Sequence, residues 1–406
     1  MTLTRSPPAT TLNAMAEFAG GKIEIYLGPH DLGGPDDLEA AIVDFLSGAE
    51  RSLDIGVQEI DSVPIAQAIL DARWREPDPI SVSVYLEQDY LREDRRPQVE
   101  PQEGETEEEA IHRAQWSGYG SYEENRRIAD ALLTSTIDTK SDYNPDIFHQ
   151  KFCIRDYRDG AIETSALLTG STNFTTTDTH QNLNHIVVFN DTRICAEYRT
   201  EFEQIRRGEF GRREHGRVPR AYSLGGVPVK VLFAPDHTPE LEVVKQLLRA
   251  RDRVDFAIFT FAGSSAIDDA MLILADAGIT VRGVLDRGQA AQPWAAPREP
   301  GAAPRWLDHE NIELYVPKAE GDFEGLRKVH HKLMVIDDAV AIAGSFNYTA
   351  PANEYNDENL FVIGSQFTEL PSDQGGPVDP DRCAGITAHL RTEIERIIAG
   401  SERWHP

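Results

Sequence analysis

Cysteine is scarce in this chain, with three residues among 406. Cys153, Cys195 and Cys383 are odd in number and widely separated, and no Cys-x-x-Cys pair occurs. Secreted domains that depend on disulfides usually carry an even number of clustered cysteines. The cysteine content therefore argues against a disulfide framework and favours a reducing, cytoplasmic location.

Long apolar runs are also missing. No stretch of 18 apolar residues occurs, and residues 1–22 contain no apolar segment of signal-peptide length. A helix that crosses a bilayer needs about 20 mostly apolar residues, and a secretory signal needs an apolar core. We therefore expect neither export nor a membrane span. The length suffices for two or three domains that each bury a core.

Positive charge is in short supply. Lysine and arginine number 40 against 68 acidic residues, which gives a net charge of −28, and only eight of the 40 are lysines. A negative field slows the encounter with polyanions, so a nucleic acid or an anionic membrane requires a locally basic site. One arginine-rich segment occurs, within 205–226. We interpret it as a solvated linker, with a polyanion contact as the alternative. Adaptation to high salt is a further hypothesis for the acidity.

The chain contains an internal repeat. KIEIYLGP (22–29), a helix-like segment and LDIGVQEI recur as VKVLFAP (229–235), a second helix-like segment and VDFAIFTF. Each copy predicts strand, helix and strand, and then a further amphipathic helix and a β-branched strand. Alternation of this kind indicates an α/β fold with largely parallel, helix-covered sheets.

The repeat and the composition suggest a division of the chain. We expect a disordered tail over 1–20, an N-terminal domain over 21–204, an Arg/Gly-rich linker over 205–226 and a C-terminal domain over 227–406. Residues 379–403 have the pattern of a closing amphipathic helix.

Both halves carry the same polar motif, HxKxxxxD followed by GSxN. The first copy comprises His149, Lys151, Asp156, Gly170, Ser171 and Asn173. The second copy comprises His330, Lys332, Asp337, Gly344, Ser345 and Asn347. One H-x-K pair alone is more often a polar strand face than a site. Two copies at equivalent places, each with the same Asp and GSxN, indicate a function.

The spacing of the motif suits a strand, in which residues two apart share a face. Each His then lies beside its Lys, and His331 faces the other way, which favours a structural role for it. Ser171, Ser345 and the motif asparagines are expected to donate hydrogen bonds to phosphate oxygens. Asp156 and Asp337 come near the strand ends, where we expect them to hold a turn.

Each half also has a polar residue eleven positions beyond the motif Asn, namely Asn184 and Glu358. A side chain there is placed to accept a hydrogen bond from the distal ring nitrogen of a histidine and so fix its tautomer. We expect Glu358 to stabilise protonated His330 as general acid. The neutral Asn184 amide would leave His149 unprotonated as nucleophile.

The duplicated motif resembles that of the phospholipase D superfamily at every defining position, and the repeat extends the likeness over about 22–364. The resemblance implies two similar α-β-α domains around a pseudo-twofold axis, with both motif strands at one interface. It also implies catalysis through a covalent phosphohistidine, without metal or other cofactor. The two lysines and two asparagines would then hold the phosphate oxygens. An amide in the first half and Glu in the second is similar to the tyrosyl-DNA phosphodiesterase branch.

Three classes of function fit these residues. A nuclease or nucleic-acid phosphodiesterase suits a chain without export signal, and we favour it, although the charge of −28 counts against it. A phospholipase D or phosphatidyltransferase is the alternative. A non-catalytic scaffold is the third, disfavoured because both motif copies are intact. Because the chain contains both half-sites, a monomer is sufficient for chemistry, and a homodimer remains open.

Overall fold

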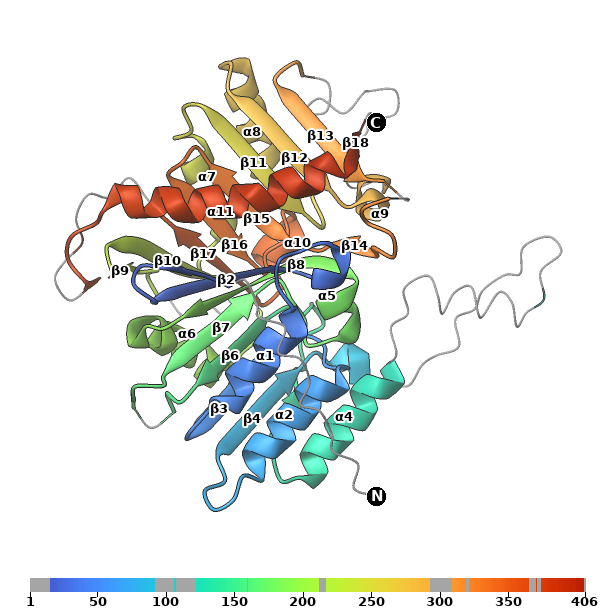
Figure 1. The fold of residues 1–406 in the computed structure, drawn as a ribbon, viewed down its shortest axis with the longest axis vertical. Helices are drawn as coiled ribbons and strands as arrows, with labels where there is room; N and C mark the ends of the chain where they lie inside the picture. The colour runs from blue at the N-terminus through green and yellow to red at the C-terminus, as the bar shows by residue number, and fades with distance from the viewer. Residues whose placement is uncertain are drawn as a thin grey trace, which may run out of the picture.

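The computed structural model describes residues 15–91, 106, 122–158, 160–211, 217–292, 309–318, 321–364, 370 and 374–404. Two nine-stranded mixed sheets form its framework, and each belongs largely to one half of the chain. The first half lies at the bottom of Figure 1, in blue and green, and the second half lies at the top, in yellow to red.

The first half alternates strands and helices along most of its length. Its strands are β1 (Ala16–Phe18), β2 (Ile23–Gly28), β3 (Ser52–Val57), β4 (Ser81–Leu86), β5 (Asp138–Ser141), β6 (Lys151–Arg155), β7 (Ala166–Gly170) and β8 (Asn182–Phe189). Its helices are η1 (His30–Leu32), α1 (Leu38–Ser47), α2 (Val63–Arg73), η2 (Gln88–Leu91), α4 (Tyr122–Thr134), α5 (Thr176–His180) and α6 (Thr192–Arg206). Helices α1 and α2 begin at the N-cap residues Asp37 and Ser62, whose side chains accept a backbone hydrogen bond.

The second half repeats this plan. Its strands are β9 (Ala221–Leu224), β10 (Val227–Ala234), β11 (Arg253–Ile258), β12 (Thr280–Leu285), β13 (Ile312–Pro317), β14 (Lys328–Val329), β15 (Lys332–Ile336), β16 (Val340–Gly344), β17 (Glu358–Ile363) and β18 (Ser401–Arg403). Its helices are α7 (Pro239–Leu247), α8 (Ala266–Asp276), α9 (Arg287–Ala290), α10 (Ala350–Glu354) and α11 (Pro380–Ala399). Helix α11 is the closing helix expected from the sequence.

The two sheets share one strand order. The first runs β1-β2-β8-β7-β6-β3-β4-β5 and the second β9-β10-β17-β16-β15-β11-β12-β13, with β18 added at its edge. The expected pair of α/β domains with mixed sheets is thereby confirmed. The expectation of largely parallel sheets is wrong in detail, because parallel pairing within each sheet path is confined to β3-β4-β5 and β11-β12-β13. The motif strands are joined by short connections, which favour antiparallel neighbours.

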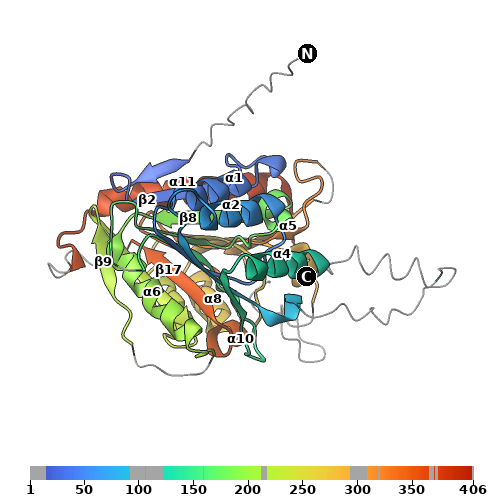
Figure 2. The same ribbon diagram turned by 90° about the horizontal axis from the view of Figure 1, so that it is seen from below.

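Three hydrophobic cores hold the layers together. Helices α1, α2 and α4 pack on one face of the first sheet, and α7 and α8 pack on one face of the second. The third core contains side chains of α6, α11 and strands of both sheets, so it joins the halves. Across it, the Phe189 and Phe361 rings meet edge to face at 5.3 Å. Figure 2 shows α11 and α6 on opposite sides of the molecule.

Two expected boundaries need correction. The tail predicted over 1–20 is not disordered throughout, because Ala16–Phe18 pairs with β2 and Phe18 packs against the shared core. Residues 1–14 lie outside the described residues. The linker predicted over 205–226 is shorter, since α6 continues to Arg206 and β9 forms a hairpin with β10 through Gly225 and Gly226.

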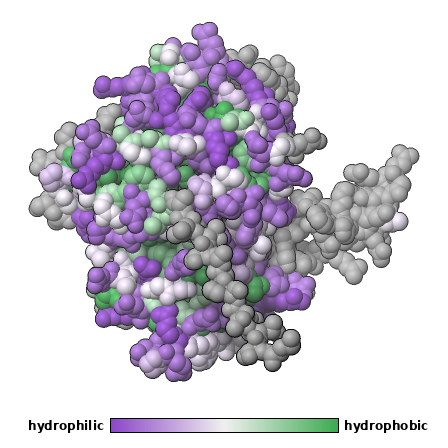
Figure 3. Space-filling model, viewed as in Figure 1, coloured by the Kyte–Doolittle hydropathy of each residue, from purple (hydrophilic) through white to green (hydrophobic). Residues whose placement is uncertain are grey.

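None of the helices in the described ranges combines the length and apolar character needed to cross a bilayer. The face shown in Figure 3 is mostly hydrophilic, with smaller hydrophobic areas between the polar ones. The three cysteines are buried and free.

Candidate active site

The two motif histidines meet at the junction of the sheets. Strands β6 and β15 begin at Lys151 and Lys332, so each His lies in the extended segment just before its strand. The backbone N–H of His149 donates to the carbonyl of Asp357 at 3.0 Å, and that of His330 donates to the carbonyl of Leu183 at 2.9 Å. Each histidine is therefore anchored to the other half of the chain.

The side chains cross the same boundary. His149 Nδ1 lies 2.7 Å from Glu358 Oε2, and His330 Nδ1 lies 2.9 Å from Asn184 Oδ1. This corrects the expected pairing, in which Glu358 would serve His330 and Asn184 would serve His149. The sequence places each acceptor in the same half as one His, but the two-fold arrangement brings it to the His of the other half. Glu358 therefore acts on the charge of His149, and Asn184 acts on that of His330.

The motif serines support these acceptors rather than the pocket. Ser171 Oγ donates to Asn184 Oδ1 at 2.7 Å, and Ser345 Oγ donates to Glu358 Oε2 at 2.6 Å. Both serines are fully buried. The expectation that they donate to phosphate oxygens is wrong, because the preceding glycine ends its strand against the strand that carries the acceptor.

That close approach explains the glycine in GSxN. A Cβ on Gly170 would lie 2.3 Å from the carbonyl oxygen of His185, and one on Gly344 would lie 2.4 Å from that of Asn359. Their φ angles of +149° and +141° also disfavour a side chain. Only glycine lets β7 and β16 come so near to β8 and β17 that serine and acceptor meet.

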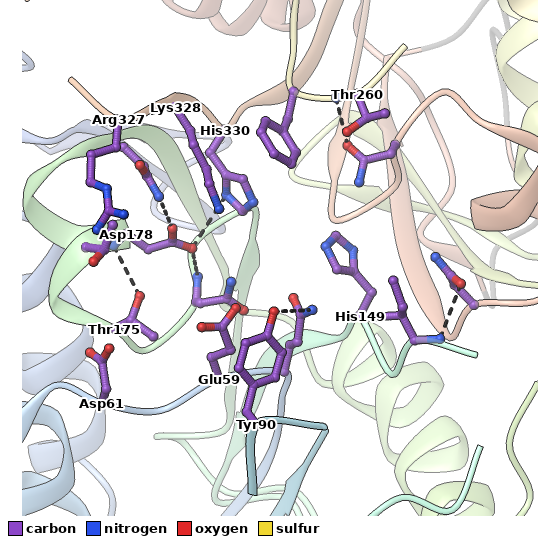
Figure 4. A pocket seen from close by; sticks show the side chains of 18 residues that line it. Glu59, Asp61, Tyr90, His149, Thr175, Asp178, Thr260, Arg327, Lys328 and His330 are labelled. Carbon is purple, nitrogen blue, oxygen red and sulfur yellow. Dashed lines mark hydrogen bonds and ion pairs between the residues drawn. The ribbon is translucent and has the colours of Figure 1, made fainter. Parts of the chain in front are cut away.

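Both histidines open onto one pocket (Figure 4). Asn173 and Asn347 line it, as the sequence predicted for groups that contact phosphate. The other lining residues are Gln58, Glu59, Asp61, Tyr90, Ile147, Thr175, Thr177, Asp178, Asn182, Phe259, Thr260, Arg327, Lys328 and Asn356. Figure 4 shows His149 on one side, and His330, Asp178, Lys328 and Glu59 toward the other.

The motif lysines are set back from this lining and almost completely buried. Lys151 Nζ donates to Gln58 Oε1 at 3.0 Å and to the His149 carbonyl at 2.8 Å. Lys332 Nζ donates to the His330 carbonyl at 2.8 Å and lies 5.2 Å from the centre of the Phe259 ring. The lysines thus fix the backbone of the histidines while they bring positive charge to the pocket.

Burial dominates the titration of the site. It lowers the pKa of Lys151 to about 8 and that of Lys332 well below its usual value. Burial and the nearby lysines also depress the pKa of His149 and of His330. Burial raises the pKa of Glu358 to about 8. The imidazoles are therefore neutral at neutral pH, and an anionic ligand would offset the lysines and favour protonation of an imidazole.

The remaining predicted residues lie away from the pocket. Asp156 accepts backbone N–H groups of residues 50–52, and Asp337 accepts those of residues 251–253. Both have positive φ angles, at a turn after the motif strand. His331 is buried, with Nδ1 3.2 Å from His185 Nδ1 and Nε2 3.3 Å from Glu393 Oε1. Each of the three therefore has a structural setting.

Sequence reasoning missed several pocket residues. Gln58 and Glu59 follow β3, and Phe259 and Thr260 follow β11, at equivalent places in the repeat. These strands have parallel neighbours, and the carboxyl ends of parallel strands are a common place for binding sites. That rule, applied to LDIGVQEI and VDFAIFTF, gives a signal by which they could have been found. Within the described residues no group of three His, Cys, Asp or Glu is arranged to hold a metal.

Comparison with known families supports the assignment of the fold and motif. A model of the family described as cardiolipin synthase, PLD-like domain, matches residues 42–206 and 243–371, well over half of the chain. The chain therefore belongs to the phospholipase D superfamily.

Characterised relatives match part of the chain. A phospholipase D of Rickettsia conorii is 30% identical over 132 residues, which is 32% of this chain and 60% of the relative. The mitochondrial cardiolipin hydrolase of Xenopus laevis is 32% identical over 141 residues, 33% of this chain and 59% of the relative. The chain thus spans about three fifths of the length of these relatives.

Among solved structures, the phosphatidylserine synthase of Haemophilus influenzae Rd KW20 is similar over 97% of this chain and 90% of its own. The TM-score is 0.61 and the sequence identity is 12%. This likeness shows that the fold is common to both proteins.

Proposed function

We propose that this protein cleaves the headgroup phosphodiester of a phospholipid, by hydrolysis or transfer, through a phosphohistidine. The observation that carries the proposal is the single pocket onto which His149 and His330 open, each with an Nδ1 acceptor. With Nδ1 engaged, Nε2 of either ring is available to phosphorus or to a leaving oxygen. Two such rings are what a displacement in two steps requires.

Phospholipid replaces nucleic acid as the favoured substrate. The curated relatives above are named phospholipase D and cardiolipin hydrolase. The arginine-rich segment offers less positive charge than its sequence suggests. Arg206, Arg207 and Arg217 each pair with a glutamate, and Arg212 and Arg213 lie outside the described residues. Together with the net charge of −28, this pairing disfavours a polyanion.

The two halves place side chains of different character at one position of the pocket lining. Ile147, which precedes the first motif, lines the pocket and is 45% exposed. Its equivalent in the second half is Lys328, which lies with Asp178 and Glu59 across from His149 in Figure 4. A phospholipid diester has one polar and one apolar alcohol, so it matches this division better than a nucleic acid with two similar nucleosides.

The proposed roles are His149 as nucleophile and His330 as general acid. When His149 Nε2 bonds to phosphorus its ring becomes cationic, which lowers the pKa of the adjacent Glu358 and lets its carboxylate compensate that charge. His330 loses its positive charge as it protonates the headgroup oxygen, so a neutral acceptor such as Asn184 suits it better. The residues keep the roles expected from the sequence, for the opposite electrostatic reason.

The proposed reaction has two steps, formation and breakdown of the phosphohistidine. His149 Nε2 attacks phosphorus, the bond to the headgroup oxygen breaks, and His330 supplies the proton to that oxygen. Water or an alcohol then attacks the phosphohistidine, His330 takes its proton, and the P–N bond breaks to free His149. The buried lysines and the two asparagines stabilise the phosphate oxygens as charge develops on them.

The test is headgroup release from vesicles of phosphatidylethanolamine, phosphatidylglycerol, phosphatidylcholine or cardiolipin, in EDTA, with DNA and RNA assayed in parallel. We expect phosphatidic acid, detected by mass spectrometry, from at least one lipid with the wild-type protein and none with His149→Ala. Cleavage of nucleic acid with every lipid intact would overturn the choice of substrate. Loss of activity in EDTA would contradict the cofactor-free mechanism.

A further inference from the structure

Glu59 is an unexpected residue in a pocket built for an anion. It lines the pocket with the two histidines and is half-buried, and its equivalent in the second half is the neutral Thr260. Within the described residues Glu59 forms no ion pair with a lysine or arginine, and the Tyr90 side chain is a hydrogen-bond partner of its carboxylate. A carboxylate there repels the phosphodiester, and a ligand with positive charge would offset this repulsion.

Further oxygen acceptors share this wall. The backbone N–H of Phe174 donates to the Glu59 carbonyl, which places Asn173 next to Glu59. Asn173 is 4% exposed, and its Oδ1 accepts no hydrogen bond within the described structure. Tyr90 lies beside Glu59 in Figure 4 and adds a hydroxyl. Lys328, on the same side of the pocket, partly offsets the charge of Glu59 without forming an ion pair with its carboxylate.

The position of Glu59 relative to the two histidines indicates which part of the substrate it contacts. In a phosphoryl displacement the attacking and leaving atoms lie roughly in line through phosphorus. Figure 4 places His149 on one side and Glu59 toward the side of His330, the proposed acid that protonates the leaving oxygen. The alcohol that leaves, the headgroup, is therefore the part that reaches Glu59.

We propose that Glu59, Tyr90 and the Asn173 carbonyl form a subsite for a primary ammonium on the headgroup, as in an ethanolamine ester. The three donors of a primary ammonium match these three oxygen groups. A quaternary ammonium has no donor and is usually held by several aromatic rings, whereas this wall has one. The inference rests on the proposed function, because it assigns the leaving alcohol of that reaction.

Burial raises the pKa of Glu59 to about 7, with the negative charge of Asp178 adding to the effect. A bound ammonium would lower this pKa and keep the carboxylate ionised.

The experiment is equilibrium binding of soluble phosphomonoesters by calorimetry, which needs no turnover. The wild-type protein is expected to bind O-phosphoethanolamine about tenfold or more tightly than methyl phosphate or phosphocholine, the effect of a charge-assisted hydrogen bond. Glu59→Gln and Glu59→Thr are expected to remove this preference, and methyl phosphate should bind at least as tightly as to the wild type because the repulsion by the carboxylate is lost. Glu50→Gln, the same change at an exposed residue away from the pocket, is the matched control.

Equal affinity for the three ligands, no measurable binding of O-phosphoethanolamine, or a preference that survives both substitutions would overturn the proposal. A similar loss for all ligands in the variants would show that Glu59 has only a structural role. If the preference is found but no lipid is cleaved, the subsite stands and the proposed function fails. If lipid is cleaved without any preference for ethanolamine esters, the proposed function stands and the subsite fails.

Discussion

The two halves of the chain carry the same motif but surround it differently. Around His149 lie the Glu358 carboxylate and Gln58, which accepts from Lys151. Around His330 lie the Asn184 amide and Phe259, whose ring packs at a tilt with its centre 5.1 Å from that of the His330 ring. The repeat thus supplies the framework twice, and substitutions at the immediate neighbours make the two histidines different in charge and hydrogen bonding.

The largest expected effects on kcat come from the two motif histidines, because one attacks phosphorus and the other donates a proton. His149→Ala is expected to lower kcat at least about 10⁴-fold on every phosphodiester, because the covalent path is lost. His330→Ala is expected to lower it by about 10²- to 10⁴-fold on an alkyl ester. The leaving group of a nitrophenyl ester is a phenolate that needs no proton. With this ester, His330→Ala should therefore form the phosphohistidine at nearly the wild-type rate. The burst of nitrophenol from each variant measures this, and a burst from His149→Ala alone would reverse the roles.

A second prediction compares the two acceptors. Glu358→Gln keeps a hydrogen-bond acceptor but removes the charge that compensates phosphorylated His149, so we expect a loss in kcat of about 10²- to 10³-fold. Asn184→Leu removes a neutral acceptor, and the nearby Asp178, 3.5 Å from His330 Nδ1, retains some orientation. We expect about a tenfold loss. Steady-state rates on one lipid decide the order, and equal losses would remove the distinction between the halves.

A third prediction concerns pH. Because burial lowers the pKa of Lys151 to about 8, this side chain loses its proton and its charge as the pH rises through that value. The value of kcat/KM, which reports on the free enzyme, should then fall about tenfold per pH unit above pH 8. Lys151→Arg keeps the positive charge, so the fall of kcat/KM above pH 8 should disappear even if the maximum value of kcat/KM changes. An unchanged limb in Lys151→Arg would assign the titration to another group.

The smallest effect on catalysis is expected for the two motif aspartates. Asp156 is almost completely buried, and it accepts three backbone N–H groups and the Thr164 hydroxyl. Asp337 accepts three N–H groups but is half-buried. We expect Asp156→Ala to lower the free energy of unfolding by about 2–3 kcal/mol and Asp337→Ala by about 1–2 kcal/mol. Urea unfolding measures both, and kcat of the folded variants should be near that of the wild type.

The sequence predicted the features that depend on one copy of the repeat. Two intact motifs, a motif strand and a GSxN after the following strand can all be read from spacing, although each strand begins at the motif Lys and not at the His. The positions of Asn173 and Asn347 at the pocket, and of His331 away from it, can be predicted in the same way.

Features that depend on contact between the copies could not be predicted in this way. The distance between Glu358 and a His along the chain does not reveal that β17 faces the first motif across the junction. For the same reason the serines were expected at the phosphate, although the acceptor on the neighbouring strand lies closer to them. Glu59 was not predicted because a carboxylate after a strand is common in an acidic chain. Only its position beside the histidines in the folded chain indicates a function.

The crossed hydrogen bonds of His149 and His330 have a consequence for how such a protein can vary. In a symmetric dimer of identical halves, a substitution at the acceptor position changes both histidines together, so both become better or worse at the same task. Once the halves share one chain, each acceptor can change alone. Because the acceptor of each His is encoded in the opposite half, a mutation in one half specialises the histidine of the other.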